Sequence, residues 1–214
     1  MRTVLSHLPD LLHGFAITLQ LTVLGFLGAL VLGTVLAVWR IGPITPLRVI
    51  GSIYVEIFRN IPLLALLILF VFGLPDVGLT YSYFTSTAIC LALSGAAFVC
   101  EAMRSGINSV SVGQAEAARA IGLSFSRSLR FIILPQAFRA MVQPLTNVFI
   151  GVVLSSSLAS AVGVADLTNR TQYLNLQYAE ATAAFLVSGF FYIVVSLAGG
   201  AFGGYLERRL RVYR

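Results

Sequence analysis

The sequence predicts an all-α membrane protein with about five transmembrane helices in a single domain, residues 1–214. Two observations support this fold class. Hydrophobic residues make up 58% of the chain and charged residues 10%, whereas an ordinary soluble domain carries about 25% charged residues. In addition, apolar runs without charge recur along the chain, and a helix needs about 20 apolar residues to cross the hydrocarbon core. Spans and short loops therefore account for nearly the whole chain.

Five apolar runs locate the expected helices. Three are long enough to span by themselves, at residues 14–39, 140–165 and 181–206. The other two cover residues 61–74 and 84–100. They reach spanning length only if their helices extend through the charged segments 54–60 and 101–106. The loops are then expected near residues 40–49, 75–83, 107–139 and 166–179.

Glycines predict where these helices pack closely. The first expected span carries Gly25 and Gly28. The last span has small-xxx-small spacing at Gly189, Gly199, Gly200, Gly203 and Gly204. Because small residues let helix backbones approach each other in lipid, we expect helix contacts at these positions.

The arginines predict the orientation of the chain in the membrane. All 14 basic residues are arginine, and most of them fall on one side of a five-span arrangement. That side holds Arg40, Arg48, Arg119, Arg127, Arg130, Arg139, Arg208, Arg209, Arg211 and Arg214. The other side has only Arg2 and Arg170. By the positive-inside rule, the N-terminus is expected outside the cell and the C-terminus in the cytoplasm.

Several function classes are excluded or disfavoured by composition. A chain without lysine has no Walker A loop, so it is not an ordinary P-loop ATPase, and it performs no Schiff-base chemistry. Cys90 and Cys100, like His7 and His13, lack the spacing of a zinc site. No arrangement typical of an intramembrane enzyme is present in the sequence. The positive charge lies at membrane borders without the basic, aromatic face of a nucleic-acid-binding protein, so no nucleic acid is expected as a partner.

The segment 107–139 is the one long polar interruption of the apolar chain. Ser111 and Gln114 have the spacing of a capping box and predict the start of a helix over residues 112–121. Gly122 is the expected stop signal of that helix. A short, stiff helix at the membrane surface follows from this pattern.

A second helix is expected in the same segment. Ser124 can cap a helix over residues 125–134, and Pro135 is expected to end it because proline lacks a backbone donor. The small Ala117 and Ala118 allow close approach by a partner surface. Charged residues keep the segment out of lipid, namely Glu116, Arg119, Arg127 and Arg130. The alternative interpretation is a solvated amphipathic linker between two spans.

Two charge pairs lie near the ends of expected spans. Glu56 precedes Arg59 by three residues, and Glu101 precedes Arg104 by three, so each pair shares a helix face. An unpaired charge at membrane depth is expensive, and ionisable residues there are candidates for function. These four residues are therefore possible gate charges in a shared polar layer. In the alternative, each pair only neutralises itself at the headgroup boundary.

A spaced motif connects the polar segment to a known family. It consists of Glu116-Ala117-Ala118, then Gly122 after three residues, then Ile132-Ile133-Leu134-Pro135 after nine more. This motif resembles the cytoplasmic loop of the permease subunits of bacterial ABC importers. The resemblance identifies residues 107–139 as an ATPase-docking loop, with Glu116, Ala117, Ala118 and Gly122 as its docking residues.

The resemblance to the polar amino acid subgroup of these permeases extends over almost the whole chain. The matching signatures are Tyr54 with Arg59-Asn60-Ile61-Pro62-Leu63, Glu101-Ala102-Met103-Arg104-Ser105-Gly106-Ile107, Gly113-Gln114-Ala115, Leu134-Pro135-Gln136-Ala137, Pro144 with Asn147, Ser157-Leu158-Ala159, Gly163-Val164 and Leu167-Thr168. The variants around Arg59 and Arg104 are most similar to members that transport glutamate or a related amino acid.

The resemblance also implies a fold, a location and partners. It implies a type I ABC importer permease fold in the bacterial cell membrane. Expected partners are a dimer of a cytoplasmic ATP-binding subunit, a second permease subunit that is identical or a sister, and an extracytoplasmic solute-binding protein. This chain is expected to bind no cofactor itself, since ATP and Mg belong to the ATPase.

One departure from the subgroup concerns the substrate. Many members carry Lys-Asp-Thr-Ser before the Leu-Ala of the fourth span, whereas this chain has Leu154-Ser155-Ser156-Ser157. Hydroxyl groups there offer donors and acceptors without charge. Ser155, Ser156 and Ser157 are therefore a possible substrate path. In the alternative, these serines bond back to their own helix.

Together these observations predict a permease subunit of an ATP-driven importer of a polar amino acid, with glutamate or glutamine favoured. The alternative is a small channel or secondary transporter that works without ATP. Copurification with a nucleotide-binding subunit distinguishes the two. The chain is not expected to be an enzyme, because ATP hydrolysis falls to the partner subunit.

Overall fold

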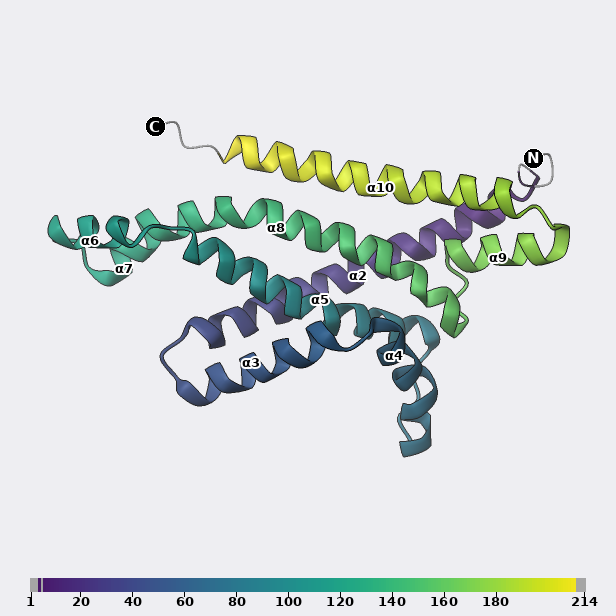
Figure 1. Cartoon of the computed structure of the whole chain (residues 1–214), viewed down its shortest axis with the longest axis horizontal. Coiled ribbons are helices and arrows are strands. Elements are labelled where there is room, and N and C mark those ends of the chain that lie inside the picture. The colour runs from purple at the N-terminus through teal and green to yellow at the C-terminus, as the bar shows by residue number, and fades with distance from the viewer. Residues whose placement is uncertain (1–3, 5, 211–214) are drawn as a thin grey trace.

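The structure, a computed structural model, describes residue 4 and residues 6–210, and these contain helices but no strand (Figure 1). Four helices are long and apolar enough to cross a membrane: α2 (Leu8–Ile41), α5 (Tyr83–Asn108), the continuous helix Phe125–Val162 and α10 (Ala181–Arg209). A fifth span is possible only as a bent pair, Thr45–Asn60 with Leu63–Val77. The predicted fold class is confirmed, with four or five spans.

The centre of the molecule is the contact between α2 and α5. Leu21 of α2 and Leu91 of α5 are almost fully buried in one core cluster, together with Leu67 from α4 (Leu63–Ile68). A Cβ atom added to Gly25 would lie 2.7 Å from Leu91 Cβ, and one added to Gly28 would lie 2.7 Å from Ala92 Cβ. These distances leave no room for a side chain, so the close packing predicted at both glycines is confirmed.

The last span, α10, packs on α8 (Leu134–Ser155) through two glycines. Added Cβ atoms would lie 2.6 Å from Phe149 at Gly199 and 2.1 Å from Thr146 at Gly203. Gly189 has no atom within 4 Å of such a position, so the packing predicted there is wrong for the isolated subunit. The opposite face of α10 exposes large apolar side chains, as expected of a helix in contact with lipid.

The second expected span is not a single straight helix. Helix α3 (Thr45–Asn60) and the segment Leu63–Val77 meet at an angle of 100°. Pro62 lacks a backbone donor and disfavours helical geometry in the residue before it, and Ile61 is extended, with φ −75° and ψ 129°. The prediction that the helix continues from residues 54–60 into 61–74 is therefore wrong. The third span behaves as predicted, since α5 continues through residues 101–106.

Helical residues enter all four predicted loops: α3 begins at Thr45 within 40–49, η2 (Leu74–Val77) extends into 75–83, and the other two loops contain whole helices. The segment 107–139 holds α6 (Val112–Ala120), α7 (Phe125–Ser128) and the π-helical turn η3 (Leu129–Ile133). The segment 166–179 forms α9 (Leu167–Tyr178), which follows the short 3-10 helix η4 (Ser156–Val162). Helices α6 and α7 project at one end of the molecule, and α9 lies at the other end, near the start of α10 (Figure 1).

Candidate functional site

The segment 107–139 forms a helical hairpin with its turn at Gly122. Helix α6 ends at Ala120, and Gly122 has φ +81°. The N–H of Gly122 donates to Arg119 O at 2.9 Å, and the N–H of Leu123 donates to Ala118 O at 3.0 Å. These hydrogen bonds satisfy the last carbonyls of the helix, which confirms Gly122 as the predicted stop.

The start of α6 is in the predicted place, but the capping box is not formed. Ser111 precedes the first helical residue and makes no side-chain capping hydrogen bond. Instead, the backbone carbonyl of Ser111 accepts from the N–H of Gln114 at 3.0 Å. Ser124 likewise precedes α7 without a side-chain cap. The extended backbone of both serines is enough to begin each helix.

The hairpin exposes more apolar surface than its sequence suggested. Glu116 and Ala117 are exposed, whereas Ala118 is only 1% exposed and packs inside the hairpin, so it is not part of the outer surface. Four large apolar side chains are between 66% and 79% exposed, namely Val112, Ile121, Phe125 and Phe131. Large exposed apolar side chains on a segment that also bears arginines are typical of a contact with another protein. The exposure of these residues was not predicted, because the sequence does not show which face of a short helix stays uncovered.

The helix after the hairpin does not end at Pro135. The N–H of Leu134 donates to Leu129 O, five residues back, so a wider π turn lies just before the proline. A π turn of this kind accommodates a residue that disturbs the regular helix, and the chain continues as helix through Val162. The hairpin is thus joined rigidly to the span that follows it.

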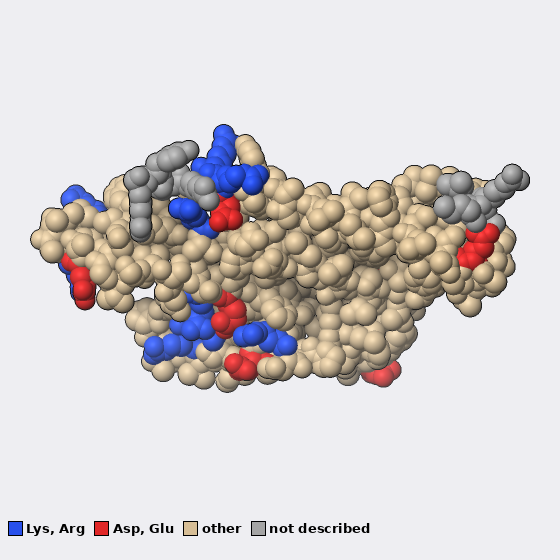
Figure 2. All heavy atoms as spheres, turned by 45° about the horizontal axis from the view of Figure 1, so that its top comes forward, with Lys and Arg blue, Asp and Glu red and all other residues tan. Residues whose placement is uncertain are grey.

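Most of the described arginines lie toward the end of the molecule that carries the hairpin, whereas Arg170 belongs to α9 at the other end. Figure 2 shows blue side chains only over the half of this face that carries α6 and α7. All of them are arginines, because the chain has no lysine. Arg2, Arg211 and Arg214, which also entered the orientation argument, lie outside the described residues. The arginines seen in Figure 2 thus lie on one side, as in the five-span arrangement from which the orientation was predicted.

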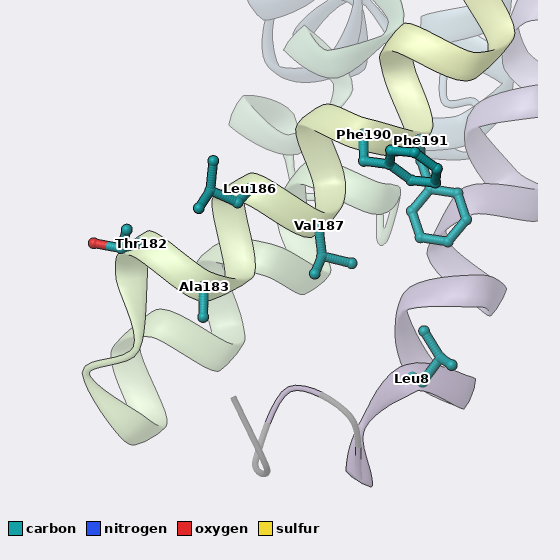
Figure 3. A pocket seen from close by; sticks show the side chains of 7 residues that line it. All are labelled: Leu8, Thr182, Ala183, Leu186, Val187, Phe190 and Phe191. Carbon is teal, nitrogen blue, oxygen red and sulfur yellow. The ribbon is translucent and has the colours of Figure 1, made fainter.

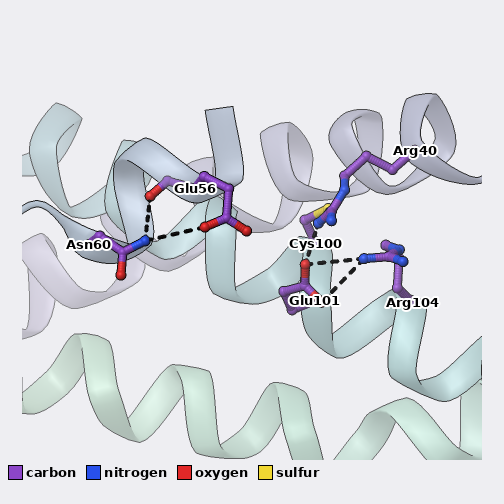
Figure 4. Close-up of polar contacts among 6 residues, drawn as sticks. All are labelled: Arg40, Glu56, Asn60, Cys100, Glu101 and Arg104. Atoms are coloured by element: carbon purple, nitrogen blue, oxygen red, sulfur yellow. Dashed lines mark hydrogen bonds and ion pairs between the residues drawn. The ribbon is translucent and has the colours of Figure 1, made fainter. Parts of the chain in front are cut away.

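A charged cluster joins α2 to α5 near that end (Figure 4). Arg40 Nη1 of α2 forms an ion pair with Glu101 Oε1 of α5. Arg104 Nη1 lies 3.2 Å from Glu101 Oε1, so the predicted pair within α5 is present. The side chain of Arg40 is only 11% exposed, and those of Glu101 and Arg104 are each 31% exposed. The role of Arg40 as a partner of Glu101 was not predicted, because spacing along one helix does not reveal a partner on another.

The other predicted pair, Glu56 with Arg59, does not form. The Glu56 carboxylate accepts from Asn60 Nδ2 at 3.4 Å, and the same nitrogen donates to Glu56 O at 2.7 Å. Arg59 lies with its guanidinium carbon 5.9 Å from the centroid of the Phe98 ring. Glu56 and Arg59 thus contact other residues instead of each other, and the ion pairs of the polar layer join Arg40, Glu101 and Arg104.

A cavity of about 360 Å³ lies between α4, α5 and α8. Its polar lining residues are Ser94 on α5, and Asn147 and Ser155 on α8, and the rest of its wall is apolar or glycine. Of the three serines predicted as a substrate path, Ser155 lines this cavity. Ser156 donates to Val153 O and Ser157 to Leu154 O, each at 2.7 Å. These two hydroxyls bond back to their own helix, as the alternative interpretation expected.

A second hollow lies between the start of α2 and α10 at the α9 end (Figure 3). Its volume is about 470 Å³, and it is lined by Leu8, Thr182, Ala183, Leu186, Val187, Phe190 and Phe191. Only Thr182 has a polar side chain, so the hollow offers a polar solute almost nothing to bind.

Near the same end, the start of α9 is fixed by a buried carboxylate. Asp166 is fully buried and caps the helix by accepting from the N–H of Asn169 at 2.9 Å. The hydroxyl of Tyr192 on α10 donates to it at 3.5 Å, and Thr18 on α2 accepts from the N–H of Leu167 at 3.1 Å. Burial raises the pKa of Asp166 to about 6, although the hydrogen bonds act in the opposite direction.

Comparison with known proteins relates this architecture to transport systems. The chain is 38% identical over 93% of its length and 92% of the relative's to the probable glutamine ABC transporter permease protein GlnM of Bacillus subtilis. It is 41% identical to the glutamate transport system permease protein GluC of Corynebacterium efficiens, over 74% of this chain and 75% of the relative. The solved structure of an amino acid ABC transporter with histidines matches with a TM-score of 0.90 and 31% identity, over 96% of both chains. Residues 29–212 match the family described as binding-protein-dependent transport system inner membrane component, and the chain is a member of that family.

Proposed function

We propose that this chain is the transmembrane permease subunit of an ATP-driven ABC importer for a polar amino acid, with glutamate or glutamine as the favoured solute. The observation that supports it best is the similarity to glutamine and glutamate permeases over most of the chain. A solved amino acid ABC transporter with nearly the same fold supports the same substrate class. The chain itself contributes part of the pore and no catalytic residue.

The hairpin around Gly122 is the proposed docking site for a dimer of a cytoplasmic ATP-binding subunit. Exposed Glu116 and Ala117 lie on α6, and exposed Ile121 and Phe125 flank the turn. Ala118 packs inside the hairpin, and Gly122 forms its exposed turn. Because the hairpin continues through η3 into α8, a movement of the ATPase would be transmitted to a helix that lines the cavity. ATP and Mg bind to the ATPase in this proposal, and this chain binds no cofactor.

The orientation places the arginine-rich end and the C-terminus in the cytoplasm and the N-terminus outside, as the positive-inside rule favours. The α9 end then faces the extracytoplasmic solute-binding protein. A second permease subunit, identical or a sister, completes the pore. The chain acts in the bacterial cell membrane and contacts no nucleic acid.

The cavity bounded by Ser94, Asn147 and Ser155 is the proposed solute path. It offers hydroxyl and amide groups and no charged side chain. Neutral donors and acceptors of this kind can bind an amide or a carboxylate, but they do not balance the charge of a cationic side chain. Ser156 and Ser157 support the helix at this place, since their hydroxyls are engaged by its backbone.

The charged cluster is the proposed gate. Arg40, Glu101 and Arg104 tie α2 to α5 near the cytoplasmic end of both helices, and Glu56 and Arg59 lie on α3, which packs on the same two helices. A partly exposed ion pair between two helices can separate and re-form when they move. Glu56 and Arg59, which have no ionic partner among the described residues, are available for contacts in another conformation.

Uptake by reconstituted vesicles tests the proposal. The chain is produced with the ATP-binding subunit and the solute-binding protein encoded beside it, and uptake of labelled glutamine and glutamate is measured with and without ATP. We expect uptake that requires ATP, the ATPase and the binding protein. A channel or secondary transporter would move solute without ATP, and that result would reject the proposal.

A further inference from the structure

A large groove lies at the base of the hairpin, separate from the cavity described above. Its volume is about 940 Å³, and its walls come from the end of α5, from α6, from η3 with α8, and from the end of α10. Its polar lining residues are Ser109, Gln114, Gln136, Arg139, Gln143 and Glu207. None of them lines the cavity with Ser155, so the two hollows are distinct.

Two opposite charges face this groove from different helices. Arg139 lies on α8 and Glu207 on α10, and both are half-buried. No hydrogen bond or ion pair joins either side chain to another described residue, in contrast to Glu101, which binds two arginines. The groove therefore presents one cation and one anion that form no ion pair with any other described residue.

Neutral groups between these charges complete the lining. Gln114 and Gln143 are exposed, and their amides make no hydrogen bond with another described side chain or backbone group. Gln136 is already engaged, because its amide donates to Ile132 O at 2.9 Å. An amide offers both donors and an acceptor, so Gln114 and Gln143 can bind a polar side chain of either kind.

We propose that this groove is a second amino-acid site, which binds a free zwitterionic α-amino acid from the cytoplasm. Its carboxylate binds the guanidinium of Arg139 and its ammonium group binds the carboxylate of Glu207. The inference rests on the proposed function for the class of solute and for the cytoplasmic position of this end. An anion alone would be repelled by Glu207, and a cation alone by Arg139. An apolar segment would leave both charges unpaired.

An amino acid bound in the groove would contact three helices at once. Gln114 belongs to α6 of the hairpin, Arg139 to α8 and Glu207 to α10. A bound amino acid would connect these three elements, so it would bias the hairpin toward the conformation in which the groove is intact.

The proposal is tested by asking whether an amino acid protects a cysteine introduced in the groove from labelling by a maleimide. Gln143→Cys is placed in a chain that carries Cys90→Ala and Cys100→Ala, and the complex with the ATP-binding subunit is reconstituted in nanodiscs of phosphatidylglycerol. We expect L-glutamine to slow maleimide labelling at this cysteine several-fold. Arg139→Gln and Glu207→Gln should each weaken this protection at least about tenfold in apparent affinity, as loss of a charge-assisted hydrogen bond predicts. Arg48→Gln, which removes an arginine at the same end outside the groove, should leave it unchanged.

A charge swap separates binding from folding. Arg139→Glu alone should abolish protection, and Arg139→Glu combined with Glu207→Arg should restore it at least in part, because a zwitterion can bind in the reverse direction. Glutaramic acid and 4-aminobutanamide, which each lack one of the two charges of glutamine, should not protect. Equal protection by either compound, or no rescue in the double variant, would overturn the proposal.

Other occupants give different results in the same experiment. Protection by the ATP-binding subunit without amino acid would mean that the groove is a protein contact. Protection by phosphatidylethanolamine, whose headgroup also carries both charges, would mean that it binds lipid. Either result overturns the amino-acid site. Uptake that persists while Gln143→Cys stays unprotected would reject this site and leave the transport function intact. Protection without any uptake would reject the transport function and leave the site.

Discussion

Arg40 on α2 and Glu101 on α5 form an ion pair although 61 residues separate them in the chain. The pair lies near the arginine-rich end of the two helices that form the centre of the molecule. The Arg40 guanidinium is nearly buried, and Arg104 reaches the same carboxylate from the next turn of α5. The contact therefore holds α2 against α5, and α5 lines the proposed path.

The first prediction concerns this pair. Glu101→Gln should lower the free energy of unfolding of the complex by about 1–3 kcal/mol, because it removes a charge-assisted hydrogen bond and leaves Arg40 without its counter-ion. Glu56→Gln is the matched control, since Glu56 makes no ion pair with another described residue. Thermal unfolding of the two purified variants measures the difference. An equal effect of both substitutions would contradict a specific role for the pair.

The second prediction concerns the hairpin turn. Gly122→Val should abolish transport while the subunit still inserts in the membrane, because a β-branched residue at φ +81° is strained by about 1–3 kcal/mol. No atom lies within 4 Å of the position that a Cβ would take at Gly122 or at Gly113, so space is open at both. Gly113 lies inside α6 without a positive φ, and Gly113→Val is therefore the control.

ATP-dependent uptake is compared for the two variants at equal membrane abundance. We expect it to be lost at Gly122→Val and largely kept at Gly113→Val. Wild-type uptake by the Gly122 variant would show that the turn does not transmit work from the ATPase.

Two prolines, Pro62 and Pro135, have different effects on their helices that the sequence did not predict. Pro62 breaks the second span with a bend of 100°, whereas the helix continues through Pro135. Both residues lack the same backbone donor. The difference lies in the preceding turn: the π turn Leu129–Ile133 accommodates Pro135, and Ile61 is extended before Pro62. Composition and spacing predicted where the spans lie and where α6 stops at Gly122, but not which proline the helix would tolerate.

The candidate sites were predictable only where their residues lie close together in the sequence. The pair Glu101 with Arg104 follows from helical spacing, and the turn at Gly122 from a local stop signal. The partner Arg40 comes from another helix. The cavity combines Ser155 with Ser94 and Asn147, and these come from two helices that meet only in the folded chain. Local sequence patterns do not predict contacts between residues of different helices, because these contacts depend on how the helices cross.

The third prediction concerns the pH dependence of the α9 anchor. Burial raises the pKa of Asp166 from 3.8 to about 6 in the folded chain. Because the folded-state pKa lies above the unfolded value, stabilisation is complete at low pH and is lost as pH rises through about 6. The shift corresponds to about 3 kcal/mol lost by neutral pH. Hydrogen exchange of the α9 amides should therefore slow as pH falls from about 7 to about 5, after correction for the intrinsic exchange rate.

Asp166→Asn should remove this pH dependence, because the amide does not titrate. His7, which lies within 3.3 Å of Tyr178 at the end of α9, is unchanged in that variant. The difference between the wild type and Asp166→Asn therefore isolates the carboxyl. Identical pH profiles for the two proteins would contradict the assignment to Asp166.

The fourth prediction concerns orientation. Single cysteines are introduced at Ser126 in the hairpin and at Leu176, which is 84% exposed on α9, in a chain without Cys90 and Cys100. In intact cells, a membrane-impermeant maleimide should label the cysteine at position 176 and leave the one at 126 unlabelled until the membrane is permeabilised. The reverse pattern would invert the topology, and the hairpin would then face away from any cytoplasmic ATPase.

The last prediction concerns the solute. Ser155 lines a cavity that contains no charged side chain, so Ser155→Asp would place a carboxylate beside the proposed path. A like charge in a poorly hydrated path repels an acidic solute by up to several kcal/mol before screening. Uptake of glutamate should therefore fall more than uptake of glutamine. The wild type should transport arginine poorly, because no carboxylate lines the cavity.

Ser157→Asp is the matched control, because it adds the same charge two residues away, outside the cavity lining. Competitive uptake of labelled glutamate, glutamine and arginine is compared for the wild type and both variants in vesicles that contain the complete complex. A loss specific to glutamate in Ser155→Asp alone would place the solute beside Ser155. An equal loss of all three solutes would indicate a packing defect in α8, and efficient arginine uptake by the wild type would reject the argument from the missing charges.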